Sequence, residues 1–176
     1  SKEDLTRLGK FERYRDVDGD GIHYRTLPGT DHPLAAYFNR GSGHNEKAQY
    51  TERPIDYQNL VDRLSKKHDT ARKHVPRAVV DLVAGAKIGI LAYGSTDCPM
   101  QECRDQLERE HNLKTSYLRL RALPFNEQIQ EFVDRHERVY VVEQNRDGQL
   151  MQLLAPHLRG DIVKMRSVRK YDGIPL

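Results

Sequence analysis

The chain has 176 residues, of which 37% are hydrophobic and 31% charged, and its formal net charge is +3. This length predicts one domain, or one domain with an extended arm. A membrane helix needs about 20 apolar residues, and the longest candidate, Ala86 to Tyr93, is interrupted by Lys87 and Gly89. The N-terminus lacks the basic start and apolar stretch of a signal peptide. We therefore expect no membrane partner and a cytoplasmic location.

Cysteine content and net charge limit which metal sites and partners the chain is expected to have. Cys98 and Cys103 are the only cysteines, too few for a disulfide framework or for an iron–sulfur or zinc site. The segment Asp16 to Gly21 opens like a calcium-binding loop, but its twelfth position is Leu27 where a bidentate glutamate is needed. We interpret it as a glycine turn and predict no metal site. The small basic excess has no supporting motif, so we expect no nucleic-acid partner.

Residues 1–84 are expected to form an extended arm and a linker helix. Glycine and proline recur throughout the first 51 residues, with little sustained periodicity. An arm of this length is expected to lie against a neighbouring chain or domain. Pro54 then opens a segment to about His74 whose apolar residues are spaced like one face of a helix.

Residues 85–176 alternate between strand and helix signals, which predicts an α/β fold with a parallel sheet and crossover helices. The expected class is a three-layer sandwich. The predicted order is strand, helix, strand, helix, strand, helix and edge strand, over the segments Lys87–Tyr93, Pro99 to about Glu110, Thr115–Leu120, Asn126 to about His136, Arg138–Glu143, Gly148 to about Ala155 and Asp161–Val168. Asn126 and Asp147 are predicted helix caps.

Two loops follow predicted strands at the carboxyl edge of this sheet, where open α/β sheets present ligands and partners. The first contains Gly94, Ser95 and Thr96, and its free N–H groups could hold a phosphate or carboxylate, although such residues are also ordinary helix caps. The second contains Glu143, Asn145 and Arg146, which are also frequent in turns. Both loops are candidates for anion binding or for a subunit contact.

The arm carries several candidate anion binders or proton carriers, but no spacing pattern connects them, which favours scattered surface residues. They are His23, Arg25, His32, Arg40, His44 and Arg53. The sequence shows no nucleophile elbow and no Ser/His/Asp order. Hydrolytic catalysis by this chain alone is therefore not indicated.

Several segments, in the same order, resemble the back part of the alpha subunit of thiamine-dependent 2-oxoacid:ferredoxin oxidoreductases. The resemblance runs from about Asp16 to the end and is most like the branch that acts on 2-oxoglutarate or on broad 2-oxoacids. The segments are Gly19–Pro33, Asn39–Glu46, Ala92–Thr96, Leu118–Phe125, Val141–Gln149 and Tyr171–Leu176.

The resemblance implies a domain like the transketolase C-terminal domain from residue 85 onward, preceded by the tail of the pyrimidine-binding region. It also implies oxidative decarboxylation of a 2-oxoacid with coenzyme A, giving acyl-CoA, carbon dioxide and reduced ferredoxin. Thiamine pyrophosphate and an iron–sulfur cluster would serve the whole enzyme, largely on the beta subunit. This chain alone is expected to bind neither cofactor and to be inactive.

Under this resemblance, Arg25, Arg40 and His44 are candidates for substrate or interface contacts near an active site shared between subunits. The loops with Gly94, Ser95, Thr96, Glu143, Asn145 and Arg146 would bind coenzyme A, a phosphate or a subunit. Two alternatives stay open: a non-catalytic module for subunit assembly, and the C-terminal domain of another thiamine-dependent enzyme.

Overall fold

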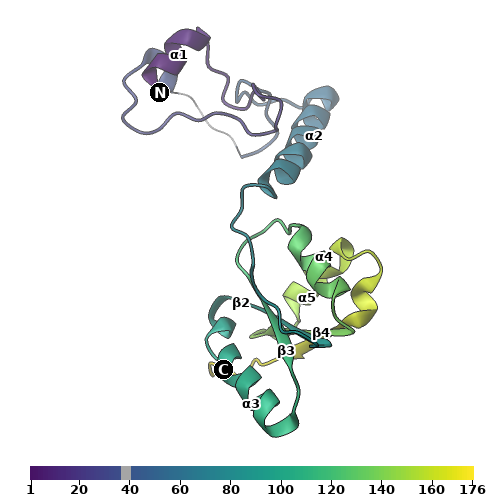
Figure 1. Cartoon of the computed structure of the whole chain (residues 1–176). Coiled ribbons are helices and arrows are strands. Elements are labelled where there is room, and N and C mark those ends of the chain that lie inside the picture. The colour runs from purple at the N-terminus through teal and green to yellow at the C-terminus, as the bar shows by residue number, and fades with distance from the viewer. Residues whose placement is uncertain (37–40) are drawn as a thin grey trace. The chain divides into compact units, whose positions relative to one another are not determined.

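The chain folds into two compact units, Ser1–His74 and Val75–Leu176. The computed structural model describes residues 1–36 and 41–176 (Figure 1). The second unit begins at Val75, before the predicted start at residue 85.

The first unit is mostly irregular chain around two helices. Helix α1 spans Lys2–Leu8 and helix α2 spans Pro54–Ala71, with a short 3-10 turn, η1, at Pro33–Ala35 between them. The predicted helix from Pro54 is confirmed. Helix α1 was not predicted: the Ser1 hydroxyl accepts a hydrogen bond from the Asp4 N–H (3.2 Å), and Gly9 ends the helix in the left-handed conformation.

The turn formed by residues 16–21 docks against α2. The Arg63 guanidinium donates to the Gly21 carbonyl (3.1 Å), and the Thr70 hydroxyl donates to the Asp20 carbonyl (2.6 Å). Gly21 has φ +80°, and a Cβ there would lie 2.4 Å from the Lys67 nitrogen. Glycine is therefore required at this position both for its backbone conformation and for the close approach to α2.

The second unit is an α/β domain around a five-stranded, mostly parallel sheet with strand order β1-β3-β2-β4-β5. The central strands are confirmed with the predicted limits at Thr115–Leu120 (β3) and Arg138–Glu143 (β4), and β2 spans Ile88–Tyr93. They pair in parallel, with Ile88 opposite both Thr115 and Arg138. All three strands therefore end at the same edge of the sheet.

Helices cover both faces of this sheet, which makes three layers (Figure 1). On one face, α4 (Glu127–Asp134) and α5 (Gln149–Leu154) contribute to a buried cluster that includes Phe132 and Leu118. On the other face, α3 (Met100–His111) places Met100 against Ile90 and Tyr117. The predicted cap of α4 is confirmed, since the Asn126 side chain accepts from the Gln128 N–H (3.2 Å).

Both edge strands depart from the prediction. Strand β1, Val79–Asp81, falls in the segment expected to be linker, yet it pairs antiparallel with β3. At the other edge, a 3-10 turn, η4, occupies Asp161–Lys164, and strand β5 is confined to Met165–Arg169. A three-residue strand with a largely exposed pattern carries too little periodicity to be recognised from sequence.

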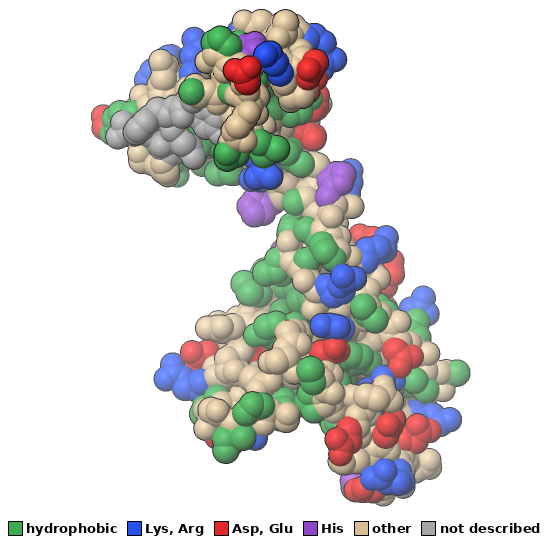
Figure 2. Space-filling view, turned by 90° about the vertical axis from the view of Figure 1, so that its left-hand side faces the viewer, with side chains coloured by type: hydrophobic (Ala, Val, Ile, Leu, Met, Phe, Trp, Pro, Cys, Tyr) green, Lys and Arg blue, Asp and Glu red, His purple; other side chains and the backbone are tan. Residues whose placement is uncertain are grey.

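The surface carries charges of both signs. On the face that Figure 2 shows, Lys and Arg side chains are interspersed with Asp and Glu in both units. Among the residues that the structure describes, no helix is long and apolar enough to cross a membrane.

Candidate functional site

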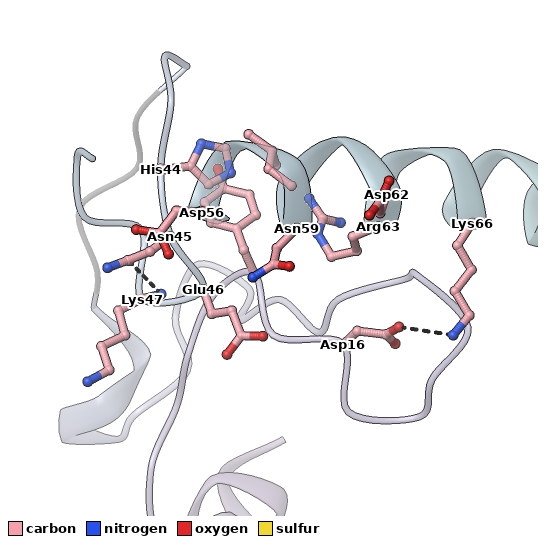
Figure 3. Close-up of a pocket in the computed structure, with 12 residues that line it drawn as sticks. Asp16, His44, Asn45, Glu46, Lys47, Asp56, Asn59, Asp62, Arg63 and Lys66 are labelled. Atoms are coloured by element: carbon pink, nitrogen blue, oxygen red, sulfur yellow. Dashed lines mark hydrogen bonds and ion pairs between the residues drawn. The ribbon is translucent and has the colours of Figure 1, made fainter. Parts of the chain in front are cut away.

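A cavity of about 530 Å³ lies within the first unit, between α2 and the loops around Asp16 and His44 (Figure 3). Its wall is strongly polar and combines carboxylates, cations and amides. The lining residues are Tyr14, Asp16, His44, Asn45, Glu46, Lys47, Asp56, Asn59, Leu60, Asp62, Arg63 and Lys66. The size is in the range of small-molecule sites.

His44, a predicted site residue, lines this cavity. Its Nδ1 lies 2.8 Å from the Ser42 carbonyl oxygen, and its ring stacks on Tyr14 with centroids 3.9 Å apart. Since a carbonyl oxygen can only accept, Nδ1 carries the proton and donates, which leaves Nε2 as the acceptor of the neutral ring. Nε2 is buried and lacks a hydrogen-bond partner among the described residues. His44 is thus held by its neighbours in one tautomer.

Asp16 belongs to the turn that opens like a calcium loop. Its Oδ2 accepts from the Gly21 N–H (3.0 Å), and the Asp20 Oδ1 accepts from the Ile22 N–H (2.8 Å). Lys66 lies 3.7 Å from the Asp16 carboxylate. These carboxylates are therefore engaged by backbone and lysine, as in an Asx turn. Among the described residues, no group of three His, Cys, Asp or Glu could hold a metal ion.

The structure places the predicted arm residues His44 and Arg25 in different hollows. Arg25 is exposed and lines a separate hollow of about 240 Å³ beside α1. Arg40 lies outside the described residues. The ring centroid of His23 lies 5.1 Å from that of Tyr14, and burial lowers the pKa of His23.

A second candidate site lies at the carboxyl edge of the sheet in the second unit. The loop after β2 forms a 3-10 turn, η2, at Gly94–Asp97, in which Ser95 is exposed and Thr96 is buried. The Gln144 side-chain nitrogen donates to the Ser95 hydroxyl (3.4 Å) and to the Thr96 hydroxyl (3.2 Å). The two predicted edge loops are therefore in direct contact, as their position after neighbouring parallel strands requires.

Glu143 has no exposed surface for a ligand. Its side chain is fully buried and accepts from the N–H groups of Leu150 (2.6 Å) and Met151 (3.2 Å) and from the Asn145 amide (2.9 Å). A buried carboxylate that receives several N–H donors is satisfied by them. Glu143 therefore fixes the first turn of α5 instead of presenting its charge to solvent.

Asn145 completes this cap. Its Oδ1 accepts from the N–H groups of Gly148 (2.7 Å) and Gln149 (3.1 Å). The prediction that Asp147 caps this helix is wrong, because the Asp147 carboxylate instead pairs with the Arg146 guanidinium at 2.7 Å. Arg146 itself is exposed, and its carbonyl accepts from Arg169 (2.9 Å).

Asp97 anchors the other edge loop from the opposite side. The Tyr117 hydroxyl donates to Asp97 Oδ1 (2.7 Å), and Arg119 forms an ion pair with Asp97 Oδ2 (3.0 Å). Burial, followed by the hydrogen bond to Asp97, raises the pKa of the Tyr117 phenol above its ordinary value. Tyr117 therefore stays protonated and acts as a donor at neutral pH.

Sequence reasoning included Gln144 and Asp97 in the two loop segments without choosing them as site residues, and it missed Tyr117. Gln144 directly follows the predicted strand Arg138–Glu143 and lies between two candidate site residues, Glu143 and Asn145. Its position could therefore have identified it as a site residue. The pairing of Tyr117 with Asp97 joins residues of different elements and had no local signature.

No family model matches the sequence. Over 171 residues the chain is 29% identical to 2-oxoacid:ferredoxin oxidoreductase 2, subunit alpha, of Aeropyrum pernix, an alignment that covers 94% of this chain. The sequence is similar to that of an oxidoreductase alpha subunit. The chain spans about a quarter (25%) of that relative's length.

The fold is also found in a solved enzyme. The structure matches 2-oxoglutarate:ferredoxin oxidoreductase from Magnetococcus marinus, solved with 2-oxoglutarate, coenzyme A and succinyl-CoA bound, with a TM-score of 0.79 and 24% identity. The match covers 96% of this chain and 29% of that chain. Both comparisons thus extend over the two units described above.

Proposed function

We propose that this chain is part of the alpha subunit of a thiamine pyrophosphate-dependent 2-oxoacid:ferredoxin oxidoreductase, with 2-oxoglutarate as the first substrate to test. The observation that carries the proposal is the alignment with the Aeropyrum pernix subunit, which extends over 94% of the chain. A match confined to the sheet would point only to a common α/β fold. Here the irregular first unit is included as well.

The proposed reaction converts a 2-oxoacid and coenzyme A to an acyl-CoA and carbon dioxide. The bond between the carboxylate carbon and the carbonyl carbon breaks and carbon dioxide leaves. The coenzyme A thiol loses its proton as its sulfur bonds to that carbonyl carbon, and the two released electrons reduce ferredoxin. Thiamine pyrophosphate supplies the carbanion chemistry when bound. The residues of this chain would bind and orient the reactants.

We assign the iron–sulfur cluster and thiamine pyrophosphate to the beta subunit. A cluster is usually held by four cysteine thiolates, whereas this chain has two cysteines, of which Cys98 is exposed and Cys103 half-buried. The donor set of this chain therefore does not fit a cluster. We further propose that the second unit corresponds to the transketolase C-terminal domain, supported by its mostly parallel sheet covered on both faces.

The two candidate sites receive different roles in this proposal. Arg25 and His44 of the first unit, with Arg40, are proposed to contact the substrate or the beta subunit. The carboxyl edge around Ser95, Gln144 and Arg146 is proposed to bind coenzyme A, since the edge of an open α/β sheet is where ligands are held and exposed arginine suits phosphate.

Coexpression of the complete alpha subunit with a candidate beta subunit tests the proposal. The expected result is a copurifying complex that reduces ferredoxin or a viologen dye only when both a 2-oxoacid and coenzyme A are present. A folded complex that turns over none of a panel of 2-oxoacids would favour an assembly module. Failure to bind any beta subunit would contradict the proposal altogether.

A further inference from the structure

Gln144 joins the two carboxyl-edge loops into one surface. Strands β2 and β4 are neighbours, with Leu91 opposite Val141, so the loops that follow them start about one strand spacing, roughly 4.8 Å, apart. The Gln144 amide bridges this gap by contacting the hydroxyls of Ser95 and Thr96. The surface is therefore formed by side chains that no single loop could assemble.

The hydrogen-bonding capacity of this surface is only partly used. The Gln144 nitrogen donates to both hydroxyl oxygens, so each hydroxyl keeps its own hydrogen available to donate. Within the described chain, Gln144 Oε1 accepts from no residue. Ser95 is exposed, whereas Thr96 is buried. The accessible surface thus offers one uncharged acceptor, Gln144 Oε1, beside one uncharged donor, the Ser95 hydroxyl.

An amide group is the complement of this pair, because its N–H can donate to Gln144 Oε1 while its carbonyl accepts from Ser95. A carboxylate or phosphate lacks the donor, and an ammonium lacks the acceptor. The chemistry of the surface therefore suits a ligand with an uncharged group that both donates and accepts, such as a secondary amide.

Both loops are held before any ligand arrives. Glu143 and Asn145 occupy the first N–H groups around the start of α5 and so fix the chain on either side of Gln144. Asp97, held by Tyr117 and Arg119, does the same for the η2 turn. Groups fixed in advance lose less conformational entropy when a ligand binds.

Three cationic residues lie on the β5 side of this surface, and two of them are ion-paired. Arg169 lies opposite Glu143 in the β4–β5 register, and the Lys170 N–H donates to the Glu143 carbonyl (2.9 Å). Arg146 and Lys170 form ion pairs with Asp147 and Asp172, whereas no ion pair is found for Arg169 among the described residues. An elongated ligand could place an amide at Gln144 and a negative group toward β5.

We propose that Gln144 and Ser95 form a subsite for the amide of an amide-bearing, phosphorylated ligand, with Gln144 as the contacting residue that selects it. The inference rests on the proposed function, in which this ligand is coenzyme A. It assigns the pantetheine arm to Gln144 and Ser95, and the phosphates to the basic side of the edge.

The test is a set of binding measurements by calorimetry on the assembled enzyme, with coenzyme A, pantetheine and adenosine 3′,5′-diphosphate as probes. Gln144→Met keeps the length of the side chain and removes its hydrogen bonds. Loss of a hydrogen bond worth about 1 kcal/mol weakens binding roughly fivefold. We expect that weakening for coenzyme A and pantetheine, with the Kd of the diphosphate unchanged.

Gln149→Met is the matched control, since Gln149 is exposed on α5 and no hydrogen bond of its side chain is found among the described residues. It should leave all three Kd values unchanged. Ser95→Ala, which removes the proposed donor, should weaken pantetheine binding as Gln144→Met does. Equal pantetheine affinity in wild type and both variants, or a loss shared by the diphosphate, would overturn the subsite.

Failure of the subsite and failure of the proposed function are distinguishable. An active wild-type enzyme that binds coenzyme A, together with unaffected Gln144→Met and Ser95→Ala variants, would overturn the subsite alone. A wild-type complex that neither turns over a 2-oxoacid nor binds coenzyme A would overturn both.

Discussion

The two units are stabilised in different ways. The second unit buries a continuous apolar core between its sheet and helices, with Leu91, Leu118 and Phe132 almost fully inaccessible. In the described part of the first unit, the buried hydrophobic residues are Leu5 and Ala48. Its chain is instead fixed by contacts from side chains to backbone, such as Arg63 and Thr70 of α2 to the turn at residues 20–21.

This difference bears on assembly. Hydrophobic burial is the dominant favourable contribution to folding, so the first unit has little stability of its own. Helix α2 also exposes Tyr57, Val61 and Leu64, spaced at i, i+4 and i+7 on one face. We infer that the first unit is stabilised by a partner surface, whereas the second unit folds independently of one.

The largest expected effect is in the core of the second unit. Phe132 is 1% exposed and lies against Gly89 of β2. Phe132→Ala removes this packing and leaves a cavity, which should cost about 3–5 kcal/mol of unfolding free energy. Denaturant unfolding of the full chain, with hydrogen exchange to assign the change to a unit, is the measurement. Val163→Ala, at a 74% exposed position, is the control and should change stability little.

The next effect should be confined to the first unit. Gly21→Ala places a methyl group 2.4 Å from the Lys67 nitrogen and should detach the turn from α2, at a cost of about 2–4 kcal/mol. Gly29→Ala is matched in backbone conformation, with φ +85°, but its Cβ would meet no atom within 4 Å. It should cost only about 1 kcal/mol. Equal exchange rates in α2 for the two variants would show that the turn does not hold this unit together.

A smaller effect is expected at the anchor of the η2 turn. Tyr117→Phe removes the hydrogen bond to Asp97 but leaves Arg119 in place, so unfolding free energy should fall by about 1 kcal/mol. Tyr140→Phe, on the neighbouring part of the sheet, removes a hydroxyl for which no hydrogen bond is found among the described residues. If both variants are equally stable, the hydrogen bond from Tyr117 to Asp97 does not contribute to the unfolding free energy.

The smallest expected effect is a pH dependence of the first unit. Burial, and the positive charges of Arg13, Arg63 and Lys67, lower the pKa of His23 below 6.5. The unfolded chain then binds the proton more tightly, so stability is fully present above pH 6.5 and is lost as the pH falls through the folded pKa. The midpoint of thermal unfolding should decline on acidification, and His23→Gln should flatten that decline. A decline of the same size in the variant would assign it to other groups.

The sequence alone was sufficient to predict strands and helices where hydrophobic residues recur with the period of the element. The limits of β4 followed from an apolar run bounded by Arg138 and Glu143, those of β3 from the alternation of strand and helix signals, and the cap at Asn126 from its position before an apolar helical face. The layers of the second unit follow from this alternation of elements.

Long-range contacts could not be predicted in this way. The bridge from Gln144 to Thr96 joins residues 48 positions apart, and Glu143 was expected at a surface although it is buried under α5. The sequence predicted the carboxyl edge of the sheet as a site and named several residues there. The role of each residue depends, however, on which hydrogen-bond donors lie next to it in the fold. In the first unit, the cavity that His44 lines is formed by three separate segments, which no spacing rule connects.

Hydrogen exchange of the alpha subunit, free and assembled with the beta subunit, tests the contrast between the units most directly. We expect β2, β3 and β4 to be equally protected in both states, while α2 and the loops of the first unit gain protection on assembly. Strong protection of the first unit in the free subunit, unchanged by the beta subunit, would contradict this expectation.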